Sequence, residues 1–252
     1  MKKNLNKNLL IRYSRQIILK NIGTFGQKKI LKSKVLIIGA GGLGCPVADL
    51  LARAGVGEIG IVDYDRISLS NIHRQILFTS KDINKYKVDV IKKRLNLINK
   101  DIKINTYNKK ASEKNLHKII SKYEIIVDGS DNFKTKFLLN KFSLKLKKIL
   151  IVGAISKFDG HIFAFNFNSK KGPCLKCFYQ SEPSDDILNC ESEGILGSTA
   201  NIVGAIQANE ILKKILNIGK DLKSNILILD LLNLNFRKVL FKKRKNCICS
   251  GS

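Results

Sequence analysis

The chain has 252 residues, which is long enough to bury a sizeable core and fits one large domain or one domain with an appendage. Its hydrophobic fraction of 44% is ordinary for a globular protein, and no uninterrupted apolar stretch reaches the ~18 residues of a membrane span. The formal net charge of +26 points to an anionic partner, but the lysines are scattered along the whole chain and lack interleaved aromatic residues. We therefore expect neither a nucleic-acid partner nor a membrane partner.

The N-terminal segment, residues 1–33, has no long apolar run before its arginines, so we expect no signal peptide and a cytoplasmic protein. Apolar residues on both sides of the polar cluster at 12–16 predict an amphipathic helix. Its arginines, Arg12 and Arg15, have two alternative roles. Both are solvated on a surface helix, or one of them reaches a phosphate, whose geometry a guanidinium matches with two hydrogen bonds.

The next segment has the pattern of a nucleotide-binding βαβ unit. A β-branched run at 35–38 predicts a buried strand, a helical pattern follows at 43–54, and 59–62 predicts the second strand. The connecting glycines allow backbone N–H groups to approach phosphate, and Asp63 ends the second strand where a carboxylate binds ribose hydroxyls. The alternative is that the glycines serve only tight packing. The glycines of this GAGGLG loop are Gly39, Gly41, Gly42 and Gly44.

Polar side chains follow the second strand at its carboxyl end, the edge where ligands bind in open α/β sheets. Arg74 is well placed for a triphosphate, although an ordinary polar connector is the alternative. Lys87 falls near the start of the helix predicted at 85–96, where the helix dipole disfavours a cation. A bound phosphate would remove that conflict, whereas a solvated lysine is common in a lysine-rich chain. The polar candidates of this segment are Asp65, Ser70, Asn71, Arg74 and Gln75.

A second group of polar residues, 128–132, follows the strand predicted at 125–127 and should face the same crevice. Mg²⁺ prefers one or two carboxylates together with phosphate oxygens, so Asp131 is a magnesium candidate. Its alternative role is to cap the helix predicted at 133–147, and it can do both. Further strands are predicted at 102–107 and 149–152, so this half alternates strand and helix in the manner of an open, mostly parallel sheet.

The pattern changes after residue 152. Residues 160–168 alternate with period two and predict an antiparallel strand, a long helix is predicted at 197–216, and two more strands at 226–230 and 235–241. The predicted fold is therefore α/β: a Rossmann-like open, mostly parallel sheet continued by antiparallel strands, with an N-terminal helical segment and a cysteine zinc knuckle. We treat 1–252 as a single domain with a nucleotide-binding half at about 34–152 and a second half at about 153–252.

Close cysteine pairs occur at 174/177 and 247/249. A CxxC sequence is ambiguous between zinc and redox chemistry. Here it follows a Gly-Pro turn and a second pair lies near the C-terminus, which favours a closed zinc site of four thiolates, Cys174, Cys177, Cys247 and Cys249. Cys190 lies in the segment 178–196, which lacks clear periodicity, and loops of that length are usually functional or disordered.

These motifs occur together and in order, and through them the chain resembles the bacterial ubiquitin-activating-enzyme-like adenylyltransferases, the ThiF/MoeB/HesA family. The resemblance extends from about residue 12 to residue 249. The motifs that carry it are RYSRQ at 12–16, GAGGLG at 39–44, Asp63 with Asp65, SNIHRQ at 70–75, Lys87, Ser130-Asp131-Asn132 and the CxxC at 174–177.

The resemblance implies a reaction in which MgATP activates the C-terminal Gly-Gly carboxylate of a small ubiquitin-like sulfur-carrier protein, giving an acyl-adenylate and pyrophosphate. A carboxylate is already ionised, so the demands are positioning and electrostatics. The implied roles are ribose binding by Asp63, phosphate binding by Arg74 and Lys87, and Mg²⁺ binding by Asp131. The glycine loop, Asp65, Ser70, Asn71, Gln75 and Asn132 complete the implied nucleotide site.

The resemblance also implies a homodimer in which Arg15, with Arg12 as the alternative, enters the site of the other subunit. Cys190 resembles a family cysteine that forms a covalent link with the carrier in the thiamine branch and is dispensable in the molybdopterin branch. A buried loop cysteine is the alternative. Sulfur delivery would then need a separate sulfurtransferase. Either pathway fits the sequence.

Two departures from the family pattern matter. The second pair is Cys247-Ile248-Cys249 where the family usually has CxxC, so Cys190 is an alternative zinc ligand. Lys136 stands where the family commonly has Arg. Two other functions stay open at this point. An NAD-dependent Rossmann oxidoreductase explains the first 65 residues equally well, and a non-catalytic carrier-binding module would keep the fold.

Overall fold

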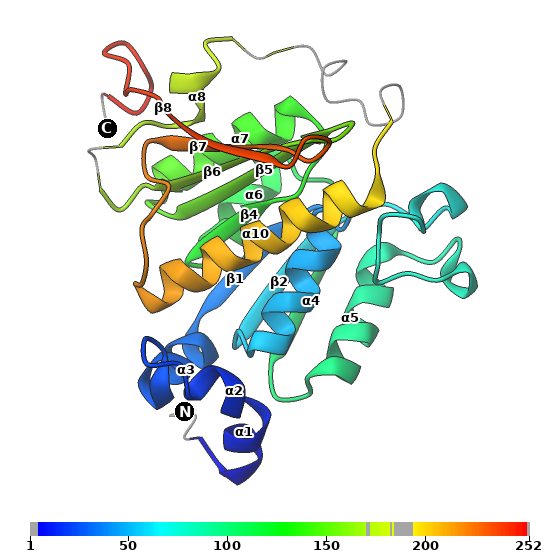
Figure 1. Cartoon of the computed structure of the whole chain (residues 1–252). Helices are drawn as coiled ribbons and strands as arrows, with labels where there is room; N and C mark the ends of the chain where they lie inside the picture. Colours follow the sequence, from blue (N-terminus) through cyan, green and yellow to red (C-terminus); the bar gives the residue numbers. More distant parts are fainter. Residues whose placement is uncertain (1–4, 170–171, 182, 184–193, 251–252) are drawn as a thin grey trace.

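The computed structural model describes residues 5–169, 172–181, 183 and 194–250 (Figure 1). The described residues form one eight-stranded sheet in the order β3-β2-β1-β4-β5-β6-β7-β8. Pairing is parallel from β3 to β5 and antiparallel from β5 to β8. The strands are β1 (Lys34–Ile38), β2 (Glu58–Asp63), β3 (Lys103–Asn108), β4 (Ile125–Asp128), β5 (Ile149–Ser156), β6 (Asp159–Asn166), β7 (Asn225–Asp230) and β8 (Asn235–Leu240).

Helices cover both faces of the sheet (Figure 1). One face carries α4 (Gly44–Ala54), α5 (Lys87–Ile98) and α10 (Gly197–Leu216), and the other carries α6 (Glu113–Ile120) and α7 (Phe133–Lys145). The short elements are η1 (Leu69–Asn71), η2 (Ser80–Asp82) and α8 (Leu175–Phe178). This layered arrangement confirms the predicted Rossmann-like fold and its antiparallel continuation.

The hydrophobic pattern of β1 explains why the sheet is buried on both faces. Val35 and Ile37 pack into the cluster formed with α4, α5 and α10. Leu36 and Ile38 pack into the opposite cluster with α6 and α7. Successive side chains of a strand point to opposite faces, so a continuous apolar run is what a central parallel strand requires.

The N-terminal segment differs from the single amphipathic helix that the sequence predicts. It forms α1 (Lys7–Arg12), α2 (Ser14–Ile17) and α3 (Gly23–Lys32), with a break between α1 and α2 at Tyr13. Tyr13 is 1% exposed, its hydroxyl accepts a hydrogen bond from Asn99 Nδ2 at 2.9 Å, and its ring packs on Gly55. Burial of this one side chain against distant parts of the chain decides where the helix ends.

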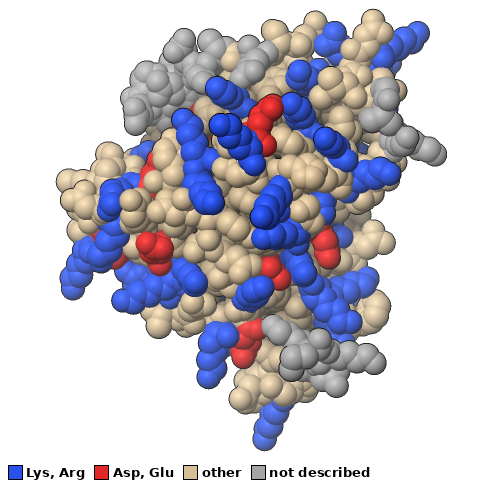
Figure 2. All heavy atoms as spheres, turned by 180° about the vertical axis from the view of Figure 1, so that it is seen from behind, with Lys and Arg blue, Asp and Glu red and all other residues tan. Residues whose placement is uncertain are grey.

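Basic side chains cover the surface on the α6–α7 side. Figure 2 shows Lys and Arg distributed over the whole visible face, with few Asp and Glu among them. Lys114, Lys118, Lys134 and Lys141 are among the exposed lysines of these two helices. Among the described residues, no helix is long and apolar enough to cross a membrane.

Candidate functional site

The glycine loop connects β1 to α4 by a tight backbone turn. Gly39 has φ +93°, a conformation that favours glycine, and a Cβ on Gly44 would lie 1.9 Å from the carbonyl oxygen of Gly39. Gly39 and Gly44 therefore meet a packing requirement. Gly41 is different, since a Cβ there would touch nothing closer than 3.9 Å in the open pocket that Gly39 and Gly42 also line. The glycine loop therefore has both predicted roles at different positions, tight packing at Gly39 and Gly44 and an open pocket wall at Gly41.

Asp63 ends β2 beneath this loop and is buried. One carboxylate oxygen accepts a hydrogen bond from the backbone N–H of Ala40 at 2.7 Å, and the other accepts from the N–H of Asp65 at 2.8 Å. Burial raises the pKa of Asp63, while the positive charge of Lys87 and these backbone donors oppose the rise. The carboxylate is thus fixed in orientation at the pocket wall.

Lys87 is the first residue of α5, and its side chain is 7% exposed. Its ammonium group donates to Asp65 Oδ2 at 2.9 Å, and its backbone N–H donates to the carbonyl oxygen of Asp65 at 3.0 Å. The carboxylate of Asp65 offsets the unfavourable position of a cation at a helix start. Both residues line the pocket, so the ammonium is held at its edge.

Arg74 lies on the segment that joins β2 to α5, and it also lines the pocket. Its Nη1 donates to the carbonyl oxygen of Ser70 at 2.7 Å and lies 2.8 Å from Nε2 of His73. Gln75 follows it and is 3% exposed, and its Oε1 is buried without a hydrogen-bond partner among the described residues.

The loop after β4 forms the opposite wall. Asp131 is exposed and lines the pocket. The N-cap of α7 is Asn132, whose side chain accepts from the N–H of Thr135 at 2.8 Å, so the predicted capping role for Asp131 is wrong. Asn132 Nδ2 donates to Asp131 Oδ1 at 3.1 Å and orients that carboxylate. Because Asn132 caps the helix, the carboxylate of Asp131 is not needed for capping. It lines the pocket and can bind a ligand there.

A buried ion pair supports this wall from below. Lys136 Nζ lies 3.2 Å from Asp128 Oδ2, and both side chains are at most 2% exposed. The ammonium also donates to the carbonyl oxygens of Ser130 and Gly153, each at 2.7 Å. Three acceptors around one buried ammonium satisfy its hydrogen-bonding capacity, which a buried charge requires. Lys136 therefore ties the end of β4 and the loop that follows it to the middle of β5.

One pocket thus collects most of the predicted nucleotide residues. Gly44 and Ser70 are exceptions, since Gly44 is packed against Gly39 and the carbonyl oxygen of Ser70 holds Arg74. The predicted residues that line the pocket are Gly39, Gly41, Gly42, Asp63, Asp65, Asn71, Arg74, Gln75, Lys87, Asp131 and Asn132.

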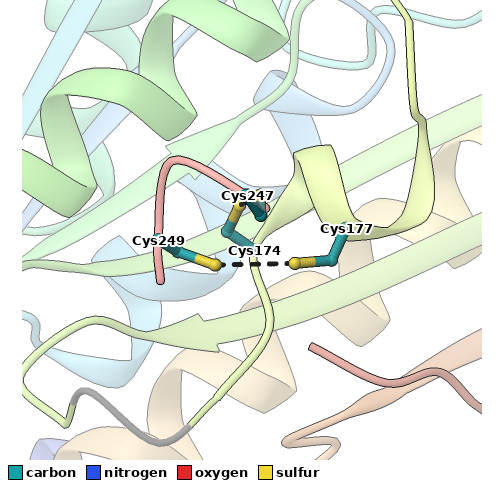
Figure 3. A group of neighbouring side chains, drawn as sticks. All are labelled: Cys174, Cys177, Cys247 and Cys249. Atoms are coloured by element: carbon teal, nitrogen blue, oxygen red, sulfur yellow. Dashed lines mark hydrogen bonds between the residues drawn. The ribbon is translucent and has the colours of Figure 1, made fainter. Parts of the chain in front are cut away.

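The four predicted zinc ligands lie together at the end of the sheet near the C-terminus (Figure 3). Cys174 and Cys177 belong to the turn at α8, and Cys247 and Cys249 approach from the C-terminal tail with their sulfur atoms directed inward. The four sulfur atoms lie within 4.8 Å of one another, and the 174–247 and 177–249 pairs are 3.5 Å apart. A tetrahedral zinc site with Zn–S bonds of ~2.3 Å needs sulfur atoms ~3.8 Å apart, so the cluster fits.

The single residue between the tail cysteines does not prevent this arrangement. Burial raises the pKa of the Cys249 thiol to about 11, so a metal would have to displace its proton. The backbone N–H of Arg244 donates to Cys177 Sγ at 3.4 Å, which stabilises a thiolate there. This donor set is suited to a soft cation such as Zn²⁺.

The model of the ThiF family matches residues 13–250, which is nearly the whole chain. This chain belongs to the ThiF family. A sulfur carrier protein adenylyltransferase of Thermus thermophilus is 37% identical over 249 residues, covering 97% of this chain and 92% of the relative. An adenylyltransferase and sulfurtransferase MOCS3 of Aedes aegypti is 40% identical over 251 residues. This match covers 98% of the ThiF-family chain but only 57% of the longer relative.

Solved structures confirm the fold of this ThiF-family chain. E. coli MccB in complex with MccA-N7isoASN superposes with a TM-score of 0.84, covering 99% of this chain and 77% of MccB at 23% sequence identity. At that identity the likeness concerns the fold alone.

Among the described residues of the ThiF-family chain, one predicted catalytic residue, Arg15, lies outside the pocket. Arg15 is exposed on α2, and Figure 1 shows α2 with α1 and α3 beside the start of β1. Its neighbour Arg12 donates to the carbonyl oxygen of Ile98 at 3.0 Å. Cys190 lies outside the described residues, so its predicted role stays a prediction.

The pocket also contains residues that were not predicted as site residues from the sequence. Tyr64, Lys109, Lys110 and Lys136 all line it, and the ammonium of Lys110 lies 5.6 Å from the ring centre of Tyr64. Lys109 and Lys110 directly follow β3, whose carboxyl end meets the same sheet edge as β2. The sequence contained a signal for Lys109 and Lys110, because polar residues that follow a strand of a parallel sheet lie at the edge where ligands bind.

Proposed function

We propose that this chain uses MgATP to adenylate the C-terminal carboxylate of a sulfur-carrier protein, releasing pyrophosphate. The observation that carries the proposal is the pocket itself. It combines a glycine loop at a helix start, the cations Arg74 and Lys87 on one side, and the carboxylate of Asp131 on the other. The name of the Thermus relative, a sulfur carrier protein adenylyltransferase, supports the choice of substrate.

Each residue has a role that its surroundings support. Arg74 and Lys87 would bind the phosphates and offset the charge that develops on pyrophosphate. Asp63, fixed by two backbone donors, would accept hydrogen bonds from the ribose. The N–H groups at the start of α4 would face the phosphates through Gly41 and Gly42. No strong base is needed, because the attacking carboxylate is already ionised.

The residues fit two metal ions of different kinds. Asp131 offers an oxygen ligand at the pocket wall, as Mg²⁺ prefers, and Mg²⁺ would reduce the repulsion between two anions. The four-cysteine cluster would hold Zn²⁺ as a structural ion that fastens the tail to α8. The same cluster supports our proposal of one domain over 1–252, with the nucleotide in the half at about 34–152.

The carrier protein would occupy the half at about 153–252. The side chains of β8 are exposed along its whole length, and they include Phe236 at 51% and Leu240 at 65% exposure. Exposed apolar side chains on an edge strand are suited to contact with a partner. In the next step, a separate sulfurtransferase would deliver sulfur to the adenylated carrier. The pathway would be thiamine or molybdopterin biosynthesis, and the protein would act in the cytoplasm.

A homodimer would complete the site, with Arg15 of each protomer reaching the other protomer's pocket. The exposure of Arg15 in the single chain supports this, since a solvated arginine is free to enter a neighbouring site. We also propose Cys190 as a residue that links covalently to the carrier. A carrier–enzyme conjugate that is lost in Cys190→Ala would support that role.

ATP–pyrophosphate exchange is the experiment that tests the proposal. Purified protein with Mg²⁺ and a Gly-Gly-ending carrier should exchange labelled pyrophosphate into ATP. Exchange that fails with every carrier of the organism, together with binding of NAD, would favour an oxidoreductase. Failure without NAD binding would favour a carrier-binding module.

A further inference from the structure

The start of α10 lies directly on the backbone of Arg74. Asn201, in the first turns of this helix, donates from Nδ2 to the carbonyl oxygen of Arg74 at 3.3 Å. The same Nδ2 donates to the carbonyl oxygen of Gly197 at 2.7 Å. One amide group therefore joins the first residue of α10 to the residue that we place on the triphosphate.

The surrounding packing leaves little room for these parts to move apart. A Cβ on Gly197 would lie 2.3 Å from the carbonyl oxygen of His73, so backbone meets backbone at this point. A Cβ on Gly42 would lie 3.1 Å from Cβ of Ala200 and 3.5 Å from Cγ of Arg74. The helix start, the arginine and the glycine loop are in mutual contact.

The orientation of the Asn201 amide is fixed by its neighbours. Two carbonyl oxygens face Nδ2, so exchanging the amide oxygen and nitrogen would place oxygen against oxygen. Oδ1 is buried without a partner among the described residues. An unpartnered buried oxygen is unfavourable for folding, and the two hydrogen bonds donated by Nδ2 offset part of that cost.

We infer that Asn201 is a positioning residue for Arg74. The guanidinium end of Arg74 is held by Ser70 and lies beside His73, and Asn201 holds its backbone end. A side chain anchored at both ends keeps one geometry before the nucleotide arrives, and less ordering remains for binding. The inference rests on the proposed function, in which Arg74 binds the phosphates of ATP.

The test compares Asn201→Ala with Asn209→Ala in the full chain. Asn209 lies on the same helix and is exposed, so it controls for changes to α10. The KM for ATP in pyrophosphate exchange should rise about 3- to 10-fold in Asn201→Ala, the equivalent of one lost hydrogen bond, and stay unchanged in Asn209→Ala. The KM for the carrier should not move in either variant. Asn201→Leu keeps a side chain of similar size, removes the donor without adding charge, and should raise the KM for ATP by a similar factor.

A double-mutant cycle separates positioning from general damage. In an Arg74→Ala background, Asn201→Ala should change the Kd for ATP, measured by direct binding, by less than about twofold, because the group that it positions is gone. A KM for ATP equal to that of the control, or full additivity with Arg74→Ala, would overturn the inference while the wild type remains active. A wild-type protein without exchange would instead overturn the proposed function and this inference with it.

Discussion

The ammonium group of Lys87 lies 2.9 Å from a carboxylate oxygen of Asp65, and the backbone N–H of Lys87 donates to the Asp65 carbonyl oxygen. Asp65 thereby holds a cation at the start of α5, in the pocket that the glycine loop also lines. Two further hydrogens of the ammonium are available to phosphate oxygens. The pair shows how the chain keeps a positive charge in place before an anionic substrate binds.

Replacing Lys87 by alanine should lower ATP–pyrophosphate exchange by ~10²- to 10³-fold, because one stabilising cation at the developing charge is lost. Asp65→Asn should lower exchange by less, because the hydrogen bond from the Lys87 backbone N–H to the carbonyl oxygen of residue 65 still positions the start of α5. Lys92→Ala, an exposed lysine on the same helix, is the control. Equal activity of Lys87→Ala and Lys92→Ala would remove Lys87 from the phosphate site.

Asp131→Ala should abolish adenylation and leave the fold intact, because the side chain is exposed and Asn132 provides the cap of α7. Circular dichroism and thermal unfolding check the fold, and exchange at increasing Mg²⁺ checks the activity. Asp89→Ala, an exposed carboxylate on α5, is the matched control. Full activity in Asp131→Ala would end its assignment to Mg²⁺.

Zinc content should be one ion per chain and should be lost in Cys247→Ser and in Cys249→Ser, with a clear fall in Tm. A structural zinc contributes folding free energy directly, so its loss exposes the tail and α8. Cys190→Ser should keep the zinc. Metal analysis showing loss of zinc in Cys190→Ser, but not in Cys247→Ser, would contradict the four-cysteine site.

Arg15→Ala and Arg74→Ala should each be inactive alone and restore activity when co-expressed. A mixed dimer has one site with both arginines intact, so random assembly should recover about one quarter of the wild-type activity. Purification with two different tags isolates the mixed dimers. No recovery in these mixed dimers would show that both arginines serve the same subunit.

The charge of Asp82, in the connection between β2 and α5, should make the free energy of unfolding depend on pH in the acid range. Its burial alone would raise its pKa, but hydrogen bonds from Thr79, Lys85 and Arg94 outweigh burial and lower the pKa below its usual range. The stabilisation by its charge is therefore present above pH ~4 and lost as the pH falls through the lowered pKa. Asp82→Asn should lower the free energy of unfolding by about 1–3 kcal/mol at pH 7, and the difference should shrink as the pH falls below ~4. A difference that stays constant between pH 7 and pH 3 would contradict this.

Local patterns predicted the parts of the fold that depend on neighbours in sequence. The apolar run of β1, the glycine loop and the acid at the end of β2 follow from strand and turn chemistry, and α10 spans 197–216 as predicted. The break at Tyr13 could not be predicted, because it depends on Gly55 and Asn99 from distant elements.

The site shows the same division. The end-of-strand rule brought Asp63 and Asp131 to one pocket, whereas the burial of Lys136 depends on acceptors from β4, β5 and the loop between β4 and α7. A lysine in a lysine-rich chain gives no signal of such burial. Asn132 rather than Asp131 caps α7, a choice between adjacent residues that only the backbone geometry decides.

The most direct test of the central claim is mass spectrometry of a carrier protein incubated with this chain and MgATP. The carrier should gain one AMP unit at its terminal glycine, with release of pyrophosphate. The same carrier without its last glycine should gain nothing. Each Gly-Gly-ending carrier of the organism is incubated in turn with folded, zinc-loaded enzyme. If every carrier stays unmodified, adenylation of a sulfur-carrier protein by this chain is contradicted.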